Sequence, residues 1–70
     1  MLERKYTLGI DIGSTTVKIA ILNQEHVLLF SDYERHFANI QETLANLLEK
    51  ALNKLGDIQV SPVITGSGGL

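Results

Sequence analysis

The sequence predicts an α/β fold in which three strands, one helix and a fourth strand follow one another along the chain. Two short apolar segments near the N-terminus are separated by a polar turn, a later segment repeats its leucines at helical spacing, and a short β-branched segment follows it. Because short turns separate the first three strands, we expect an antiparallel meander. The helix should then cross one face of the sheet and place the fourth strand parallel to the first.

The first two expected strands cover residues 5–12 and 16–22, and the second is rich in β-branched residues. Four side chains of the first strand should share one face: Tyr6, Leu8, Ile10 and Ile12. A turn at residues 23–25 leads to a third strand over residues 27–35. The charged second half of that strand is typical of a solvated sheet edge.

The expected helix covers residues 40–55, with Asn39 as its N-cap, Glu42 completing a capping box, and Gly56 just beyond its C-terminus. Its apolar residues form one stripe that should face the core: Ile40, Leu44, Leu47, Leu48, Ala51, Leu52 and Leu55. The fourth strand is expected at residues 60–65, with Pro62 near its start, where a missing donor is tolerated.

Composition limits the function classes. Seventy residues make one small unit, without cysteine and with a net charge of −2, which argues against a nucleic-acid partner. No apolar segment approaches the roughly 20 residues that span a membrane, and the N-terminus does not resemble a signal peptide. We therefore expect a soluble, cytoplasmic protein without a membrane partner. The chain stops after a glycine-rich segment, so we expect a piece of a longer protein.

Residues 8–18 carry the strongest functional signal. The first expected strand contains one carboxylate near its end. A glycine, three hydroxyl residues and a lysine follow this carboxylate. Carboxylates and water suit Mg²⁺, successive free N–H groups in a glycine turn suit phosphate oxygens, and lysine adds a point charge. The segment predicts a hairpin turn for a metal-bound phosphate. Asp11 is the candidate metal ligand and catalytic residue, and the candidate phosphate ligands are Gly13, Ser14, Thr15, Thr16 and Lys18.

Each of these features also has a structural interpretation. Asp11 alone could cap a turn, since Asp-x-Gly turns are common, but a plain hairpin needs only two special residues. Lys18 could lie on the exposed face of a twisted hairpin, and it shares strand parity with Thr16. Ser14 lacks a neighbouring base and is not expected to be a nucleophile. His26 and His36 lack partners at metal-ligand spacing and are expected at the surface.

Residues 65–69 form a second glycine-rich segment, which includes Gly66. Glycines after the carboxyl end of a parallel strand lie where ligands bind in α/β sheets, so Gly66 is a further candidate nucleotide ligand. The same residues could equally be a tail without a function. The segment matches neither a Walker A loop nor a dinucleotide fingerprint.

The segment GIDIGSTT at residues 9–16 resembles the first phosphate motif of the ATPase superfamily of actin, sugar kinases and heat-shock chaperones, which has a ribonuclease H-like fold. The expected element order agrees with the opening of that fold. Together with residues 33–37 and 64–69, the chain more closely resembles the BadF/BadG/BcrA/BcrD ATPases, which activate 2-hydroxyacyl-CoA dehydratases and benzoyl-CoA reductases. Residues 67–69 favour the larger members, called CoA-substrate-specific enzyme activases. The resemblance spans essentially the whole chain.

The resemblance implies that residues 1–70 are the N-terminal part of an actin-like ATPase domain that binds ATP or ADP with Mg²⁺. Asp11 would hold the metal through water, residues 13–16 would cradle the β- and γ-phosphates, and Lys18 would approach them. The family transfers electrons from a [4Fe-4S] cluster to its dehydratase or reductase partner, but the cluster ligands have no counterpart in this chain. The chain alone is expected to be inactive, because half of the nucleotide cleft is missing.

Two other functions stay open. The chain could belong to a sugar or acetate-type kinase of the same superfamily, which sequence beyond residue 70 would distinguish. It could instead be a non-catalytic assembly module, in which an exposed sheet edge pairs with a second copy to form a homodimer.

Overall fold

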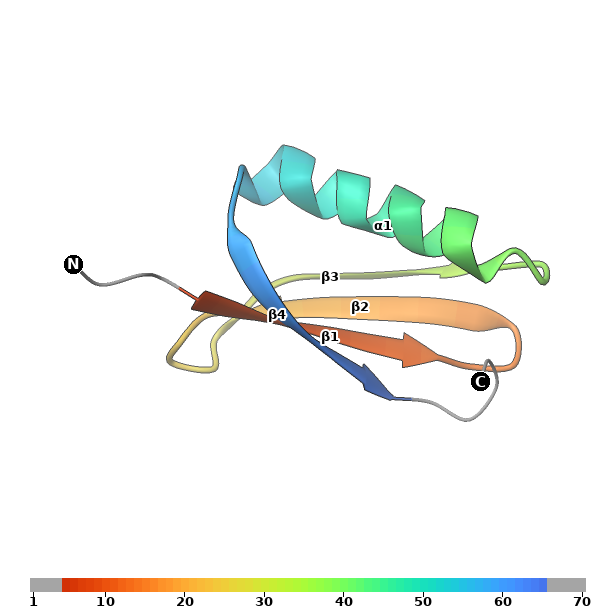
Figure 1. Cartoon of the computed structure of the whole chain (residues 1–70), viewed down its shortest axis with the longest axis horizontal. Helices are drawn as coiled ribbons and strands as arrows, with labels where there is room; N and C mark the ends of the chain where they lie inside the picture. Colours follow the sequence, from red (N-terminus) through yellow and green to blue (C-terminus); the bar gives the residue numbers. More distant parts are fainter. Residues whose placement is uncertain (1–4, 66–70) are drawn as a thin grey trace.

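The structure of the chain, a computed structural model, describes residues 5–65. Its five elements are β1 (Lys5–Ile12), β2 (Thr16–Leu22), β3 (Leu28–Arg35), α1 (Ile40–Leu55) and β4 (Gln59–Thr65). The strands form one mixed sheet in the order β3-β2-β1-β4, and α1 lies on one face of it (Figure 1). The predicted α/β class and element order are confirmed.

The strand pairing follows the prediction from turn lengths. β2 pairs antiparallel with both β1 and β3, whereas β4 pairs parallel with β1 on the other side. The helical connection between β3 and β4 carries the chain past β2 and β1 to the far edge of the sheet (Figure 1). The charged strand β3 forms one edge, as expected from its polar second half.

The core lies between α1 and the middle strands. Alternate residues of β1 and β2 point toward the helix and are buried, which is the period-2 pattern of a half-covered sheet. The buried apolar side chains are Leu8, Ile10, Ile12, Val17, Ile19, Ile21, Leu47 and Ala51. Within residues 5–65, the opposite face of the sheet carries no helix (Figure 1). All residues of β4 are exposed, because α1 packs against β2 and β3 instead.

The helix has the predicted bounds, but its N-terminus differs from the prediction. Asn39 makes no side-chain capping hydrogen bond, so the predicted capping box is wrong. The carbonyl oxygen of Asn39 instead accepts hydrogen bonds from both the N–H and Oγ1 of Thr43, at 3.2 and 2.9 Å. At the other end Gly56 has φ 83° and donates its N–H to Leu52 O, as a residue just past a helix should.

Three further details correct the sequence prediction. β3 begins at Leu28 rather than Val27, because the side chain of Asn23 accepts the N–H of Val27 and holds it in the loop. β4 begins at Gln59, and Pro62 lies in its middle, which is tolerated because β4 is an edge strand. Leu52 is 51% exposed, since α1 packs mainly against β2 and β3.

Candidate functional site

The candidate site lies where β1 ends. The β1–β2 turn follows Ile12, and β2 begins at Thr16. The parallel strand β4 ends at the same edge of the sheet, with Thr65 paired to Asp11. Ligands of α/β sheets bind at the carboxyl ends of parallel strands, so the fold places the predicted phosphate segment where such a ligand would meet it.

Asp11, Lys18 and Thr65 come together on the face without a helix. Asp11 is the register partner of Lys18 on β2 and of Thr65 on β4. The three residues line a shallow hollow of about 200 Å³, to which the small residues Gly9 and Ala20 also contribute. The structure thus joins a carboxylate, an ammonium and a hydroxyl that are up to 54 residues apart in the sequence (65 − 11 = 54).

The turn itself is open on its outer side. One backbone hydrogen bond closes it, from Gly13 N–H to Thr16 O at 2.8 Å. Ser14 and Thr15 are exposed, and within residues 5–65 their N–H groups donate to no acceptor. Unpaired N–H groups beside hydroxyls form a favourable environment for an anion.

His36 was expected at the surface, and that prediction is wrong. The residue is only 6% exposed, although β3 is an edge strand. It follows the last residue of β3 and folds back toward the β1–β2 turn, where its Nε2 lies 3.1 Å from the carbonyl oxygen of Gly13. Its backbone N–H donates to Thr15 O at 3.0 Å. The spacing of His36 to other potential metal ligands could not predict its burial against the turn, because the partners of His36 are backbone groups.

Two cations lie near the turn. Lys18 and Arg35 are both exposed, and Arg35 is the register partner of Thr16 at the start of β2. The ion pairs that the described residues form join Lys50 to Asp32 and Glu34 on the helix-covered side of β3. Neither Lys18 nor Arg35 forms an ion pair with a carboxylate of residues 5–65.

The donor set at Asp11 fits Mg²⁺ with most of its water retained. Residues 5–65 contain no group of three or more potential metal-ligating side chains. Mg²⁺ commonly uses one or two carboxylates and completes its shell with water and substrate phosphates. The exposed carboxylate of Asp11, beside the turn at residues 13–16, is one donor of that kind.

Among the predicted site residues, the structure brings together Asp11, Gly13, Ser14, Thr15, Thr16 and Lys18 at one end of the sheet. The remaining predicted ligand, Gly66, lies outside the described residues.

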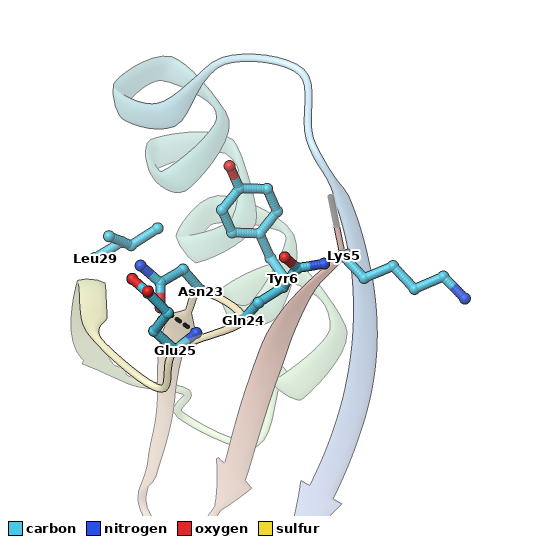
Figure 2. A pocket seen from close by; sticks show the side chains of 6 residues that line it. All are labelled: Lys5, Tyr6, Asn23, Gln24, Glu25 and Leu29. Carbon is cyan, nitrogen blue, oxygen red and sulfur yellow. Dashed lines mark hydrogen bonds between the residues drawn. The ribbon is translucent and has the colours of Figure 1, made fainter. Parts of the chain in front are cut away.

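Another hollow, of about 430 Å³, lies at the opposite end of the sheet. Figure 2 shows Glu25 joined to Asn23 by a hydrogen bond, while the side chain of Lys5 points away from them. The side chain of Asn23 serves the β2–β3 loop, because its Oδ1 accepts the N–H groups of Glu25 and Val27 at 2.8 and 3.0 Å. The expected turn at residues 23–25 is thus confirmed, and we assign this end a structural role.

No helix within residues 5–65 has the length and apolar character needed to cross a membrane. Comparison with protein-family models and with curated proteins produced no match for this chain.

Proposed function

We propose that the chain is the phosphate- and Mg²⁺-binding part of an ATPase with an actin-like, ribonuclease H-like domain. The observation that carries the proposal is the position of Asp11 opposite Lys18, directly before the open turn at residues 13–16. Asp11 holds Mg²⁺ through water, and Lys18 with the turn binds the terminal phosphates of the nucleotide. By the resemblance of its motifs, the parent protein activates a 2-hydroxyacyl-CoA dehydratase or benzoyl-CoA reductase.

The described residues supply one half of a phosphate clamp. Phosphoryl transfer requires groups that position the attacking water and neutralise charge on the far side of the phosphate. We therefore propose that residues 1–70 bind phosphate but do not hydrolyse ATP without the remainder of the ATPase. For the parent protein we further propose a [4Fe-4S] cluster, a dehydratase or reductase partner, and a location in the cytoplasm.

The proposal is tested by titrating the ¹⁵N-labelled chain with Mg-tripolyphosphate and with Mg-ADP while recording backbone amide shifts. We expect shifts confined to residues 13–16 and Lys18. Mn²⁺ in place of Mg²⁺ should broaden the resonances around Asp11. In Asp11→Asn the broadening should disappear and the fold should persist, because the Asp11 side chain is exposed.

Asp57→Asn is the matched control, because Asp57 is also exposed but lies in the loop between α1 and β4. It should behave as the unmodified chain. Mn²⁺ broadening that is unchanged in Asp11→Asn would remove the metal-binding role from this residue. Absence of any shift at millimolar Mg-tripolyphosphate would contradict phosphate binding by the isolated chain.

The edge strand β4 supports a second function, assembly with another copy of the chain. β4 is the terminal strand of the sheet, and its residues Val63 and Ile64 are 52% and 55% exposed. Unpaired edge strands readily pair with other chains. Light scattering across a concentration series tests this: Val63→Lys should abolish a dimer, whereas Val27→Lys, at a similarly exposed valine away from β4, should not.

A further inference from the structure

We propose that His36 is a positioning residue that fixes the peptide planes of the β1–β2 turn in the orientation that binds phosphate. The phosphate part of this inference rests on the proposed function, but the positioning itself does not. It stands on three hydrogen bonds of one buried residue, two of which reach the turn.

The hydrogen bonds determine which nitrogen of the imidazole carries the proton. The N–H of Ala38 donates to Nδ1 at 2.9 Å, so Nδ1 is an acceptor and is unprotonated. In the neutral ring the proton is then on Nε2. Nε2 is 3.1 Å from Gly13 O, and it donates its proton to that carbonyl.

The loop after His36 is shaped to make this arrangement. Phe37 and Ala38 both have left-handed backbone conformations, with φ 48° and 65°. A non-glycine residue adopts such a conformation only at an energetic cost. The two conformations turn the chain so that Ala38 N–H reaches the ring, and Asn39 N–H donates to the carbonyl of His36 at 2.6 Å. The backbone strain is thus located where it orients the imidazole.

His36 holds the turn at two peptide groups. Its ring donates to Gly13 O and its backbone N–H donates to Thr15 O. In a trans peptide the carbonyl and the following N–H point in opposite directions. The N–H groups of Ser14 and Thr16 therefore point away from His36.

This control matters because the turn begins with glycine. Gly13 has no Cβ and restricts the rotation of its peptide group less than another residue would, and a flipped peptide would direct Gly13 O to the side of the turn away from His36. A carbonyl oxygen repels an anion, whereas an N–H group attracts it. The hydrogen bond from His36 therefore selects the orientation that favours phosphate.

The first measurement requires no substitution. ¹⁵N-labelled histidine, observed through its ring protons, should show His36 as the Nε2-protonated tautomer with a slowly exchanging proton. An Nδ1-protonated ring or rapid averaging of the two tautomers would overturn the proposal.

The second measurement compares three variants. His36→Phe fills the ring volume without a donor, and His36→Gln retains an amide N–H for Gly13 O. Thr43→Val is the matched control, because Thr43 is equally buried, at 7%, and its Oγ1 bonds Asn39 O rather than the turn. We expect His36→Phe to shift the amides of residues 13–16, His36→Gln to restore them in part, and Thr43→Val to leave them unchanged.

The affinity for Mg-tripolyphosphate provides a separate readout. Loss of one hydrogen bond that orients the site should weaken binding about tenfold in His36→Phe, and Thr43→Val should bind as the unmodified chain. If the unmodified chain does not bind tripolyphosphate, the proposed function fails, while the tautomer and the turn amides still decide the role of His36. Unchanged turn amides in a folded His36→Phe would refute that role.

Discussion

Asp11 lies directly opposite Lys18 across the β1–β2 hairpin, yet the two side chains form no ion pair within the described residues. Both are exposed on the face of the sheet that carries no helix. A carboxylate and an ammonium that are not joined in an ion pair are available to opposite parts of one ligand. Mg²⁺ would take the carboxylate, and a phosphate oxygen would take the ammonium.

Replacement of Lys18 tests the phosphate half of this arrangement. Lys18→Gln keeps the length of the side chain and removes its charge, so the affinity for Mg-tripolyphosphate should fall about twofold to fivefold, the size expected for an exposed charge pair. The loss should shrink as ionic strength rises, because salt screens exposed charges. Isothermal titration calorimetry at two salt concentrations measures both effects.

Lys54→Gln is the control for Lys18→Gln. Lys54 is an exposed lysine in the last turn of α1, and its replacement changes the net charge equally. If both variants lose affinity to the same extent, the effect reflects overall charge and Lys18 has no specific role.

The space around Gly13 predicts a variant that separates binding from stability. A Cβ at this position would lie 3.4 Å from Thr16 Oγ1, and the φ of Gly13 is outside the left-handed region. Gly13→Ala should therefore leave the free energy of unfolding within about 1 kcal/mol, while the methyl group narrows the turn and weakens phosphate binding. Urea denaturation and tripolyphosphate titration together check this.

Gly56→Ala should show the opposite behaviour. Gly56 has φ 83° and ψ −165°, a conformation found essentially only for glycine, and open space around it, so the cost is backbone strain of about 1–3 kcal/mol. Phosphate affinity should not change, because Gly56 lies after α1.

A Gly13→Ala chain that binds phosphate as tightly as the unmodified chain would place the phosphate away from the β1–β2 turn.

Two helix residues test where the core lies. Leu47 is fully buried and Leu52 is 51% exposed, although both belong to the predicted apolar stripe. Leu47→Ala should lower the free energy of unfolding by about 2–5 kcal/mol through a cavity, whereas Leu52→Ala should cost less than about 1 kcal/mol. Equal losses in urea denaturation would show that Leu52 is covered in solution, for example by another copy.

The fold was predictable because its signals are local and repeated. The leucine spacing of α1 and the alternation of β1 and β2 gave the bounds of all three elements, and turn length gave the antiparallel pairing. The exposure of Leu52 was not predictable, since it depends on which strands the helix covers. The absence of the capping box was not predictable either, because it depends on the hydrogen bond from Asn39 N–H to the carbonyl of His36.

The candidate site was predictable only where it is contiguous in the sequence. Asp11, the turn and Lys18 share one hairpin, whereas strand parity predicted a common face only for Lys18 and Thr16. The contribution of His36 was missed because its partners are the carbonyls of Gly13 and Thr15, and main-chain acceptors leave no pattern in a sequence.

The ion pairs of Lys50 predict how stability responds to alkaline pH. The hydrogen bond to the Glu34 carboxylate, at 2.6 Å, raises the pKa of Lys50 above its ordinary value of 10.5, with Asp32 contributing further. A lysine whose pKa is raised on folding stabilises the native state fully below its unfolded pKa. That contribution is lost as pH rises through the folded pKa.

We therefore expect Lys50→Gln to lower Tm slightly and by a constant amount from pH 7 to pH 9, since the pair is solvent-exposed. The Tm difference from the unmodified chain should vanish above the raised pKa, because the lysine and the glutamine at position 50 are then both uncharged. Thermal unfolding followed by circular dichroism, from pH 7 to a pH above the raised pKa of Lys50, measures the difference directly. Lys54 has no such partner among residues 5–65, so the Tm difference between Lys54→Gln and the unmodified chain should not vanish at high pH in this way. If the Tm difference of Lys50→Gln persists at high pH, the effect comes from packing of the side chain and not from its charge.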